Sequence, residues 1–296
     1  MHKVITNQKL LQKIRIPFSS FLSTTVIISE PIIKVQENRV FTHTKEITFD
    51  ILVLCTGIKY PIFLENTNDV YVLKSGKDAL VIAQRIKDAK DILVVGGGVI
   101  GVEIAGEIVT KMPDKHLILV HSQSRLIERN KHDASEYAKH FLTKNDADII
   151  FNEKIVRHIN KEFITDKGRT IKADLCLWCA GIQWDASFMK DFPDTCFSKR
   201  NALQVNDFLQ LQDFPCIFVG GDLTDISEEK SARKAELHAK IIAKNILRIK
   251  KGKKLQPYKS KTSPQVISLG DYHGILQYKI VITGVFIIGF LKKAYL

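Results

Sequence analysis

Three glycines stand at the spacing that proteins use to hold a dinucleotide. Gly96, Gly98 and Gly101 form a G-x-G-x-x-G turn. The first glycine allows a tight turn, the second lets the backbone approach a pyrophosphate, and the third lets the following helix pack on the strand. Val99 and Ile100 open that helix, where free N–H groups and a partial positive charge attract phosphate. The stretch therefore predicts dinucleotide binding, with these five residues at the cofactor.

The elements around the glycines support this prediction. Residues 92–95 are four apolar residues that predict a buried parallel strand, and residues 102–110 continue with helical spacing. Strand, glycine turn and helix in this order are the context that the motif requires. A strand, turn and helix without a ligand is the alternative.

Asp222 is a second candidate for polar chemistry. It follows a predicted strand at 216–219 and the pair Gly220-Gly221, and a long helix is expected over about 230–250. A carboxylate at the end of a strand can bond a ribose or ribityl hydroxyl. The alternative is a plain helix N-cap.

The cysteines and histidines indicate neither a redox dithiol nor a metal. The chain has five cysteines, an odd number, which favours reduced thiols and an intracellular compartment. Cys176 and Cys179 have CxxC spacing but lie in a predicted strand, whereas a redox pair usually opens a helix. The nine histidines form no cluster with metal-ligand spacing, so no metal is expected.

The net charge of +12 is concentrated near the end of the chain. Eight lysines and arginines lie within residues 244–261, which is either a solvated helix end and linker or a surface for anionic lipid or nucleic acid. The apolar run Ile280–Leu291 is too short to span a bilayer as a helix, so it predicts a buried strand or an interfacial anchor. No signal peptide or N-myristoyl signal is recognised.

A repeated pattern predicts two domains of similar build. DILVLCTG at 50–57 and DLCLWCAG at 174–181 each follow a predicted β meander, the first of them over residues 24–49 with segments TTVIIS, IIKV, RVFTHT and EITF. Helices are expected at 76–89 and 132–145, and further strands at 116–121, 148–151, 155–159 and 162–165. The second domain carries the glycine turn, whereas residues 1–23 contain no glycine.

These pieces, in this order, resemble the flavoproteins with two dinucleotide-binding domains, the class of pyridine nucleotide–disulfide reductases and type II NADH dehydrogenases. The resemblance is greatest to the ferroptosis suppressor group of apoptosis-inducing factor homologues. It is carried by GGGVIGVEIAGEI (96–108), LVHSQSRL (119–126), LCLWCAGI (175–182), LQVNDFLQL (203–211), FVGGDLTD (218–225) and AELHAKIIAKNI (235–246). It implies an NAD(P)H–quinone oxidoreductase that carries FAD.

The resemblance also implies roles for individual residues. On the nicotinamide side, Glu103 joins the three glycines near the nicotinamide, and Ala180 and Gly181 form the turn after a neighbouring strand. On the FAD side the implied residues are Thr56, Gly57, Gly221, Asp222, Lys230 and His238. For Glu103 the alternative is a solvent-facing first-turn residue, and for His238 an ordinary core or capping histidine.

Two departures from the family pattern bear on the cofactors. The N-terminal FAD fingerprint is missing, so we expect either further residues ahead of Met1 or a lost half-site. At the end of the second strand, where NAD-preferring members carry a carboxylate, this chain has His121 with Arg125 nearby. With no carboxylate to repel a 2′-phosphate, use of NADPH as well as NADH is expected.

The sequence thus predicts an α/β fold with two Rossmann-like three-layer domains, the first incomplete, and a small C-terminal segment. The expected bounds are 1–75 and 191–252 for the FAD-binding domain, 76–190 for the NAD(P)H-binding domain, and 253–296 for a segment that contacts a membrane or a second copy. The expected function is FAD-dependent transfer of hydride from NAD(P)H to a quinone-type acceptor, in the cytoplasm or a mitochondrion, peripheral on a membrane. The alternatives are a non-catalytic dinucleotide-binding protein and, less favoured, a basic nucleic-acid-binding protein.

Overall fold

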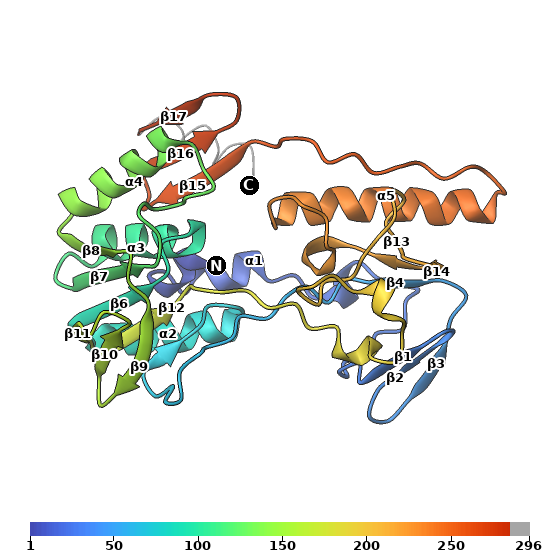
Figure 1. The fold of residues 1–296 in the computed structure, drawn as a ribbon, viewed down its shortest axis with the longest axis horizontal. Coiled ribbons are helices and arrows are strands. Elements are labelled where there is room, and N and C mark those ends of the chain that lie inside the picture. The colour runs from blue at the N-terminus through green and yellow to red at the C-terminus, as the bar shows by residue number, and fades with distance from the viewer. Residues whose placement is uncertain (285–296) are drawn as a thin grey trace. The chain divides into compact units, whose positions relative to one another are not determined.

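The computed structural model describes residues 1–284 of the chain. Contacts divide it into two compact units, each assembled from separate stretches of sequence. Of the described residues, unit 1 holds Met1–Leu22, Tyr60–Gly181 and Ser263–Gly284, and unit 2 holds Ser23–Lys59 and Ile182–Thr262. Figure 1 labels helices and strands of both units.

Unit 1 contains the predicted strand–glycine–helix stretch. Its elements, in chain order, are η1 (His2–Ile5), α1 (Leu10–Ile14), η2 (Phe18–Ser20), β5 (Val70–Tyr71), α2 (Gly76–Asp88), β6 (Asp91–Val95), α3 (Val99–Lys111), β7 (His116–His121), α4 (His132–Lys144), β8 (Ala147–Phe151), β9 (Ile155–Ile159), β10 (Glu162–Thr165), β11 (Thr170–Lys172), β12 (Leu175–Trp178), β15 (Gln265–Leu269), β16 (His273–Gln277) and β17 (Val281–Thr283).

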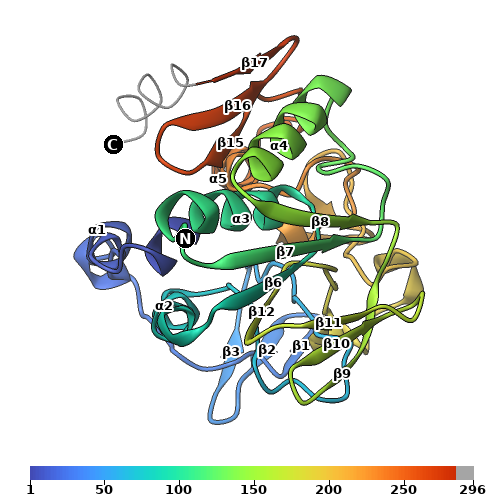
Figure 2. The same cartoon turned by 90° about the vertical axis from the view of Figure 1, so that its left-hand side faces the viewer.

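A five-stranded parallel sheet in the order β5-β12-β6-β7-β8 forms the middle of unit 1. Side chains of β6 alternate between its two faces because successive residues of a strand point to opposite sides. Ile92 and Val94 join the core formed with α2, α3 and α4, and Leu93 and Val95 join the core beneath the meander β9–β11. Figure 2 shows the resulting layers of helices, sheet and meander.

The two ends of the described chain also pack into unit 1. Val4 and Ile5 of η1 are buried with α2 and α3 in the same core. The sheet β15-β16-β17 lies over α3, where a Cβ at Gly106 would meet the Leu269 Cα at 3.0 Å (Figure 2). The expected segment 1–75 is therefore split between the units, and residues 263–284 join unit 1, because apolar residues at both ends complete its core.

Unit 2 is smaller. Its elements are β1 (Lys34–Gln36), β2 (Arg39–Phe41), β3 (Glu46–Thr48), β4 (Leu52–Leu54), η3 (Ser187–Met189), η4 (Asp194–Cys196), β13 (Gln210–Leu211), β14 (Phe214–Val219), η5 (Gly221–Leu223) and α5 (Ala232–Lys250). Strands β4 and β14 are parallel neighbours, and β13 pairs antiparallel with β14. Alternate residues of β14 again point into two different hydrophobic cores. Phe218 packs in the core that includes Ile242 of α5, whereas Ile217 and Val219 pack in the core that includes residues of β1 and β2.

The segment TTVIIS, predicted as a strand, forms no strand, and Val26 is 83% exposed there, so it has no apolar layer to pack against. The run Ile280–Leu291 begins with β17, and the rest of it lies outside the described residues.

Candidate functional site

The glycine turn of unit 1 leaves no room for side chains at two of its positions. Gly96 has φ +107°, and a Cβ there would lie 2.9 Å from the Cys179 carbonyl carbon and oxygen. A Cβ on Gly101 would lie 1.8 Å from the Gly96 oxygen. The turn and the close packing of α3 on the sheet therefore require glycine at both positions.

Gly98, by contrast, faces open space. No atom lies within 4 Å of the position that its Cβ would take. It is the N-cap of α3, which has neither a side-chain cap nor an acidic residue in its first turn. Val99 is half-buried and Ile100 is 43% exposed. The first N–H groups of the helix have no intrahelical partner, so a pyrophosphate fits this turn.

The expected 2′-phosphate site differs from the sequence interpretation. His121 is only 6% exposed, and its Nε2 lies 3.3 Å from Glu128 Oε2. Arg125 donates to the Asn130 carbonyl oxygen at 3.1 Å and to the Glu128 carbonyl oxygen. The Glu128 carboxylate is thus present near the end of β7. The Arg125 guanidinium bonds to carbonyl oxygens of its own loop. The sequence argument for NADPH did not include this carboxylate, which the loop brings back to His121.

Glu103 lies on the face of α3 that η1 and β15 cover. Its carboxylate accepts a hydrogen bond from the Ser268 N–H at 3.1 Å and lies 3.3 Å from His2 Nδ1. Burial raises the pKa of Glu103 to about 7 and lowers the pKa of His2 to about 4, so both groups are neutral near pH 6. Its partners lie inside unit 1, and it is not the solvent-facing residue of the alternative interpretation.

Ala180 and Gly181 follow β12 at the edge of the sheet where the glycine turn lies. Gly181 has φ +78°, which suits glycine. Burial raises the pKa of Cys179 to about 12 and that of Cys176 well above its usual range. These thiols are not activated as a redox dithiol would be, which agrees with the structural interpretation of the CxxC spacing.

The corresponding edge of unit 2 presents a carboxylate. After β14 the chain turns through Gly220 and Gly221, which has φ +69°, into Asp222. Among the described residues none donates a hydrogen bond to the Asp222 side chain, and burial raises its pKa. The N-cap of α5 is Ser231, so the N-cap interpretation of Asp222 is wrong. The carboxylate remains able to accept a ligand hydroxyl.

Thr56 and Gly57 lie at the same edge, beyond the end of β4. Leu54 and Val219 are in register, and the Gly220 N–H donates to the Leu54 oxygen at 2.9 Å. Thr56 is exposed, and nothing lies within 4 Å of a Cβ at Gly57. The two chain turns of unit 2 are therefore adjacent.

Lys230 supports the loop after the turn. Its ammonium donates to the carbonyl oxygens of Thr224 at 2.9 Å and Ile226 at 3.1 Å. Burial lowers its pKa, although the charge of Asp222 opposes that shift. Two of its three N–H groups are used, so one remains for a ligand.

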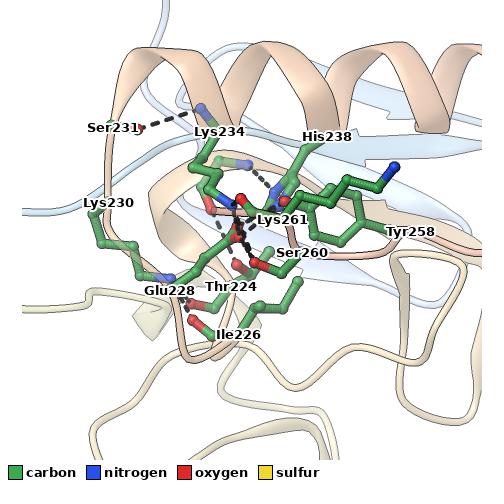
Figure 3. Close-up of polar contacts among 11 residues, drawn as sticks. Thr224, Ile226, Glu228, Lys230, Ser231, Lys234, His238, Tyr258, Ser260 and Lys261 are labelled. Atoms are coloured by element: carbon green, nitrogen blue, oxygen red, sulfur yellow. Dashed lines mark hydrogen bonds and ion pairs between the residues drawn. The ribbon is translucent and has the colours of Figure 1, made fainter. Parts of the chain in front are cut away.

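His238 lies beneath the turn in a buried polar cluster (Figure 3). It is 1% exposed, its Nδ1 accepts from the Gly221 N–H at 3.1 Å, and its Nε2 is 2.8 Å from Glu228 Oε1. Glu228 also contacts Lys234 at 2.8 Å and accepts from Tyr258 at 2.8 Å. Burial alone would raise the pKa of Glu228, but hydrogen bonds from Lys234, Ser260 and Tyr258 lower it to about 2.

Unit 2 fits only part of FAD. The open carboxylate of Asp222 and the Thr56–Gly57 turn fit the hydroxyl-bearing end. The residues described for unit 2 contain no second strand–glycine–helix turn for the pyrophosphate.

The sequence did not reveal four residues that shape these turns: Gly97, Glu128, Glu228 and Tyr258. A Cβ on Gly97 would meet Leu126 Cδ2 at 2.6 Å and His121 Cγ at 2.8 Å. Gly97 is at an x position of the G-x-G-x-x-G motif, where any residue type is allowed. Glu128, Glu228 and Tyr258 lie in loops, where no periodic sequence pattern predicts a role.

Residues 9–239 match the family model described as "Pyridine nucleotide-disulphide oxidoreductase". The chain belongs to this family. It is 30% identical to apoptosis-inducing factor homolog B of Dictyostelium discoideum, over 93% of the chain and 79% of that protein. It is also 30% identical to ferroptosis suppressor protein 1 of Mus musculus, over 77% of the chain and 64% of that protein.

The fold agrees with the family. The sulfide:quinone oxidoreductase of Aquifex aeolicus superposes with a TM-score of 0.83 at 16% identity, covering 100% of this chain and 80% of that one. The predicted α/β fold with Rossmann-like domains is confirmed, and so is the predicted family. By its family the chain is an FAD-dependent NAD(P)H oxidoreductase. Within residues 1–284 no helix is long and apolar enough to cross a bilayer.

Proposed function

We propose that the protein transfers hydride from NADH or NADPH to FAD and passes the electrons to a quinone-type acceptor. The observation that carries the proposal is the unit 1 turn, where Gly98 faces open space at the uncapped N-terminus of α3. The family and the turn of unit 2 support the flavin half. FAD, when bound, accepts the hydride and supplies the redox chemistry.

Unit 1 would bind the nicotinamide dinucleotide through its backbone. The N–H groups at the start of α3 would hold the pyrophosphate, with the helix dipole favouring its charge. The Glu128 carboxylate near the end of β7 would accept a hydrogen bond from a ribose hydroxyl. Ala180 and Gly181 would line the same edge of the sheet.

Unit 2 would hold the flavin end of FAD. Asp222 would accept from a hydroxyl of the cofactor, and the remaining Lys230 N–H would donate to an electronegative atom of it. Thr56 and Gly57 would complete the rim. Hydride transfer requires no protein acid or base, so these residues bind and orient.

A spectrum tests the flavin half directly. The purified chain is separated by gel filtration with and without prior incubation with excess FAD, and NADH is then added without oxygen. A flavin absorbance band that bleaches supports the proposal. A protein that stays colourless after incubation with FAD and still binds NADH would contradict it and favour the non-catalytic alternative.

The acceptor needs its own test. A quinone acceptor is supported by the fold similarity to the sulfide:quinone oxidoreductase of Aquifex aeolicus. A disulfide acceptor is disfavoured because the raised pKa values of Cys176 and Cys179 leave no activated dithiol. We expect NADH oxidation to accelerate with a short-chain ubiquinone analogue and not with a small disulfide such as cystine. Faster turnover with the disulfide would overturn the quinone assignment.

A membrane surface would bring a lipid-dissolved quinone to the enzyme. Tyr278, Ile280 and Ile282 around β17 are 43%, 64% and 44% exposed, and β17 is an edge strand. Exposed apolar residues of this kind favour interfacial contact. In a flotation assay, we expect a smaller fraction of the double variant Ile280→Ser, Ile282→Ser than of the wild type to rise with anionic vesicles. Added single-stranded DNA should not displace the wild-type protein from the vesicles. Equal flotation of the variant and the wild type would show that β17 does not contact the membrane. If neither protein floats, the proposed membrane contact is wrong.

A further inference from the structure

A glycine amide of the unit 1 turn is bonded to a buried histidine. The Gly97 N–H donates to His121 Nδ1 at 3.0 Å. The other ring nitrogen, Nε2, lies 3.3 Å from Glu128 Oε2. On the opposite side of the same residue, the Gly97 oxygen accepts from the Ile127 N–H at 2.7 Å. The peptide groups of Gly97 are thus held by the last residue of β7 and by the loop that follows it.

Unit 2 contains the same arrangement at its own turn. The Gly221 N–H donates to His238 Nδ1 at 3.1 Å, and His238 Nε2 lies 2.8 Å from Glu228 Oε1 (Figure 3). The histidine comes from a strand end in unit 1 and from helix α5 in unit 2. The two arrangements therefore arise from different local structures but connect the same three types of group.

The chemistry of the groups fixes the protonation of both rings. A backbone N–H can only donate, so the Nδ1 that receives it must be unprotonated. A neutral imidazole then carries its proton on Nε2, which donates to the carboxylate. Each glutamate therefore selects the ring tautomer that leaves Nδ1 free to accept the glycine N–H.

Simple space filling does not require this arrangement. His121 is 6% exposed and His238 is 1% exposed, and Gly97 is buried while Gly221 is half-buried. Without the ring acceptor, each glycine N–H would lose its partner in a place that water reaches poorly. Each bonded glycine directly follows another glycine at the end of a parallel strand, where few side chains restrain the backbone. A hydrogen bond from the inner side fixes the plane of that peptide.

We propose that His121 and His238 are positioning residues for the two cofactor turns, each kept in the accepting tautomer by its glutamate. We call each Gly–His–Glu set a turn clamp: Gly97–His121–Glu128 in unit 1 and Gly221–His238–Glu228 in unit 2. The proposal rests on the proposed function in assigning NAD(P)H to the first turn and FAD to the second.

Replacing the histidine of a clamp with asparagine or with glutamine tests its two hydrogen bonds separately. An asparagine oxygen can take the place of Nδ1, whereas a glutamine amide can take the place of Nε2. We expect His121→Asn to keep the Kd for NADH within about threefold, and His121→Gln to raise it about tenfold or more, which corresponds to loss of one hydrogen bond. The same contrast is expected for FAD with His238→Asn and His238→Gln.

Amide exchange tests the clamps without any cofactor. In 15N-glycine-labelled protein, which has 16 glycines, we expect the Gly97 and Gly221 amides to exchange slowly in the wild type and in the Asn variants and faster in the Gln variants. Equal exchange in Asn and Gln variants would show that the rings only fill space and would overturn the proposal. Normal amide results in a protein that binds no cofactor would refute the proposed function and leave the clamps standing.

The glutamate is tested in unit 1, because the Glu128 side chain is 40% exposed, whereas that of Glu228 is 5% exposed. Glu128→Gln still offers an oxygen to Nε2–H and should leave Gly97 protected. Glu128→Leu offers none and should speed exchange at Gly97. Equal protection in both would contradict the tautomer argument. His116→Asn, at a histidine that contacts no turn amide, is the matched control for both cofactors.

Folding failures are also informative. If His238→Gln unfolds while His238→Asn melts like the wild type, the asymmetry supports the clamp. If both variants melt early by the same amount, His238 serves packing alone and the proposal fails for unit 2.

Discussion

Individual backbone positions determine what the turns can do. Neighbouring atoms leave no room for a side chain at Gly96 and Gly101, whereas Gly98 faces open space and its glycine is explained only by the proposed pyrophosphate. The sequence motif predicted all three, because their roles depend on spacing alone. It did not predict Gly97, whose importance comes from His121 and Leu126, residues that fold back from the end of β7 and the loop beyond it.

The contrast between two glycines gives a prediction. Gly98→Ala adds a methyl group to open space, so we expect an unchanged Tm and at least about a tenfold rise in the Kd for NADH. Gly101→Ala forces a contact with the Gly96 oxygen and should cost about 1–3 kcal/mol of stability as well. Calorimetry measures the stability of both variants, and NADH titration measures their Kd for NADH. A Gly98→Ala protein that binds NADH normally would place the pyrophosphate elsewhere.

Glu103 should make stability depend on pH. Its pKa is raised to about 7, so between about pH 4.5 and 7 the folded protein retains a proton that the unfolded chain has lost. Stability from this group therefore falls as pH rises through that window and is level above it. Glu103→Gln cannot ionise, and we expect it to be more stable than the wild type at pH 8 by on the order of 2 kcal/mol.

Urea unfolding at pH 5 and pH 8 checks this, because the two proteins should differ less at pH 5. A variant less stable than the wild type at pH 8 would mean that the ionised carboxylate is stabilised in the fold. NADH oxidation by Glu103→Ala tests the separate expectation that this residue lies near the nicotinamide; unchanged activity would contradict it.

Secondary-structure elements were predictable where periodicity or capping signals are strong. The expected helix at 76–89 is α2, Gly76–Asp88, and the one at 132–145 is α4, His132–Lys144. The loops that complete the turns were not predictable, because their positions depend on side chains distant in sequence. The pairing of Glu228 with Lys234 and Tyr258 has no local pattern at all.

Helix α2 carries a testable cap. The Asp78 N–H donates to the Ser75 hydroxyl, and Asp78 accepts from the Ser75 N–H, which forms a capping box. We expect Ser75→Ala to lower the free energy of unfolding by about 1 kcal/mol. Ser75→Asn, another good N-cap, should restore most of it. Chemical denaturation measures both, and equal losses would show that the cap contributes little.

At the scale of the whole molecule, the units were harder to predict than the fold class. The repeated Asp–apolar–Gly pattern indicates two similar domains, and each unit does contain a sheet with parallel strands between a helix layer and a β meander. Neither η1 nor the β15–β17 sheet has a signal that assigns it to unit 1. Their membership depends on which apolar faces meet after folding.

One surface histidine should tie stability to pH. His116 lies between Asp148 at 3.0 Å and Asp91 at 2.9 Å, and hydrogen bonds to these carboxylates raise its pKa. The charged ring therefore stabilises the fold below about pH 6.5, and this contribution disappears as pH rises past its raised pKa. Since all three groups are well exposed, His116→Gln should cost up to about 1 kcal/mol at pH 6 and almost nothing at pH 9. Urea titrations at both values compare the two proteins; an equal loss at pH 9 would indicate packing instead of charge.

The order of synthesis gives unit 1 a particular problem. Its helix α3 needs Leu269 against Gly106, and about 160 residues, including most of unit 2, separate them. At ribosomal rates of about 5–20 residues per second, this apolar face waits roughly 8–30 s for its cover. During that interval unit 2 can complete its own core, while the α3 face around Gly106 in nascent unit 1 stays uncovered.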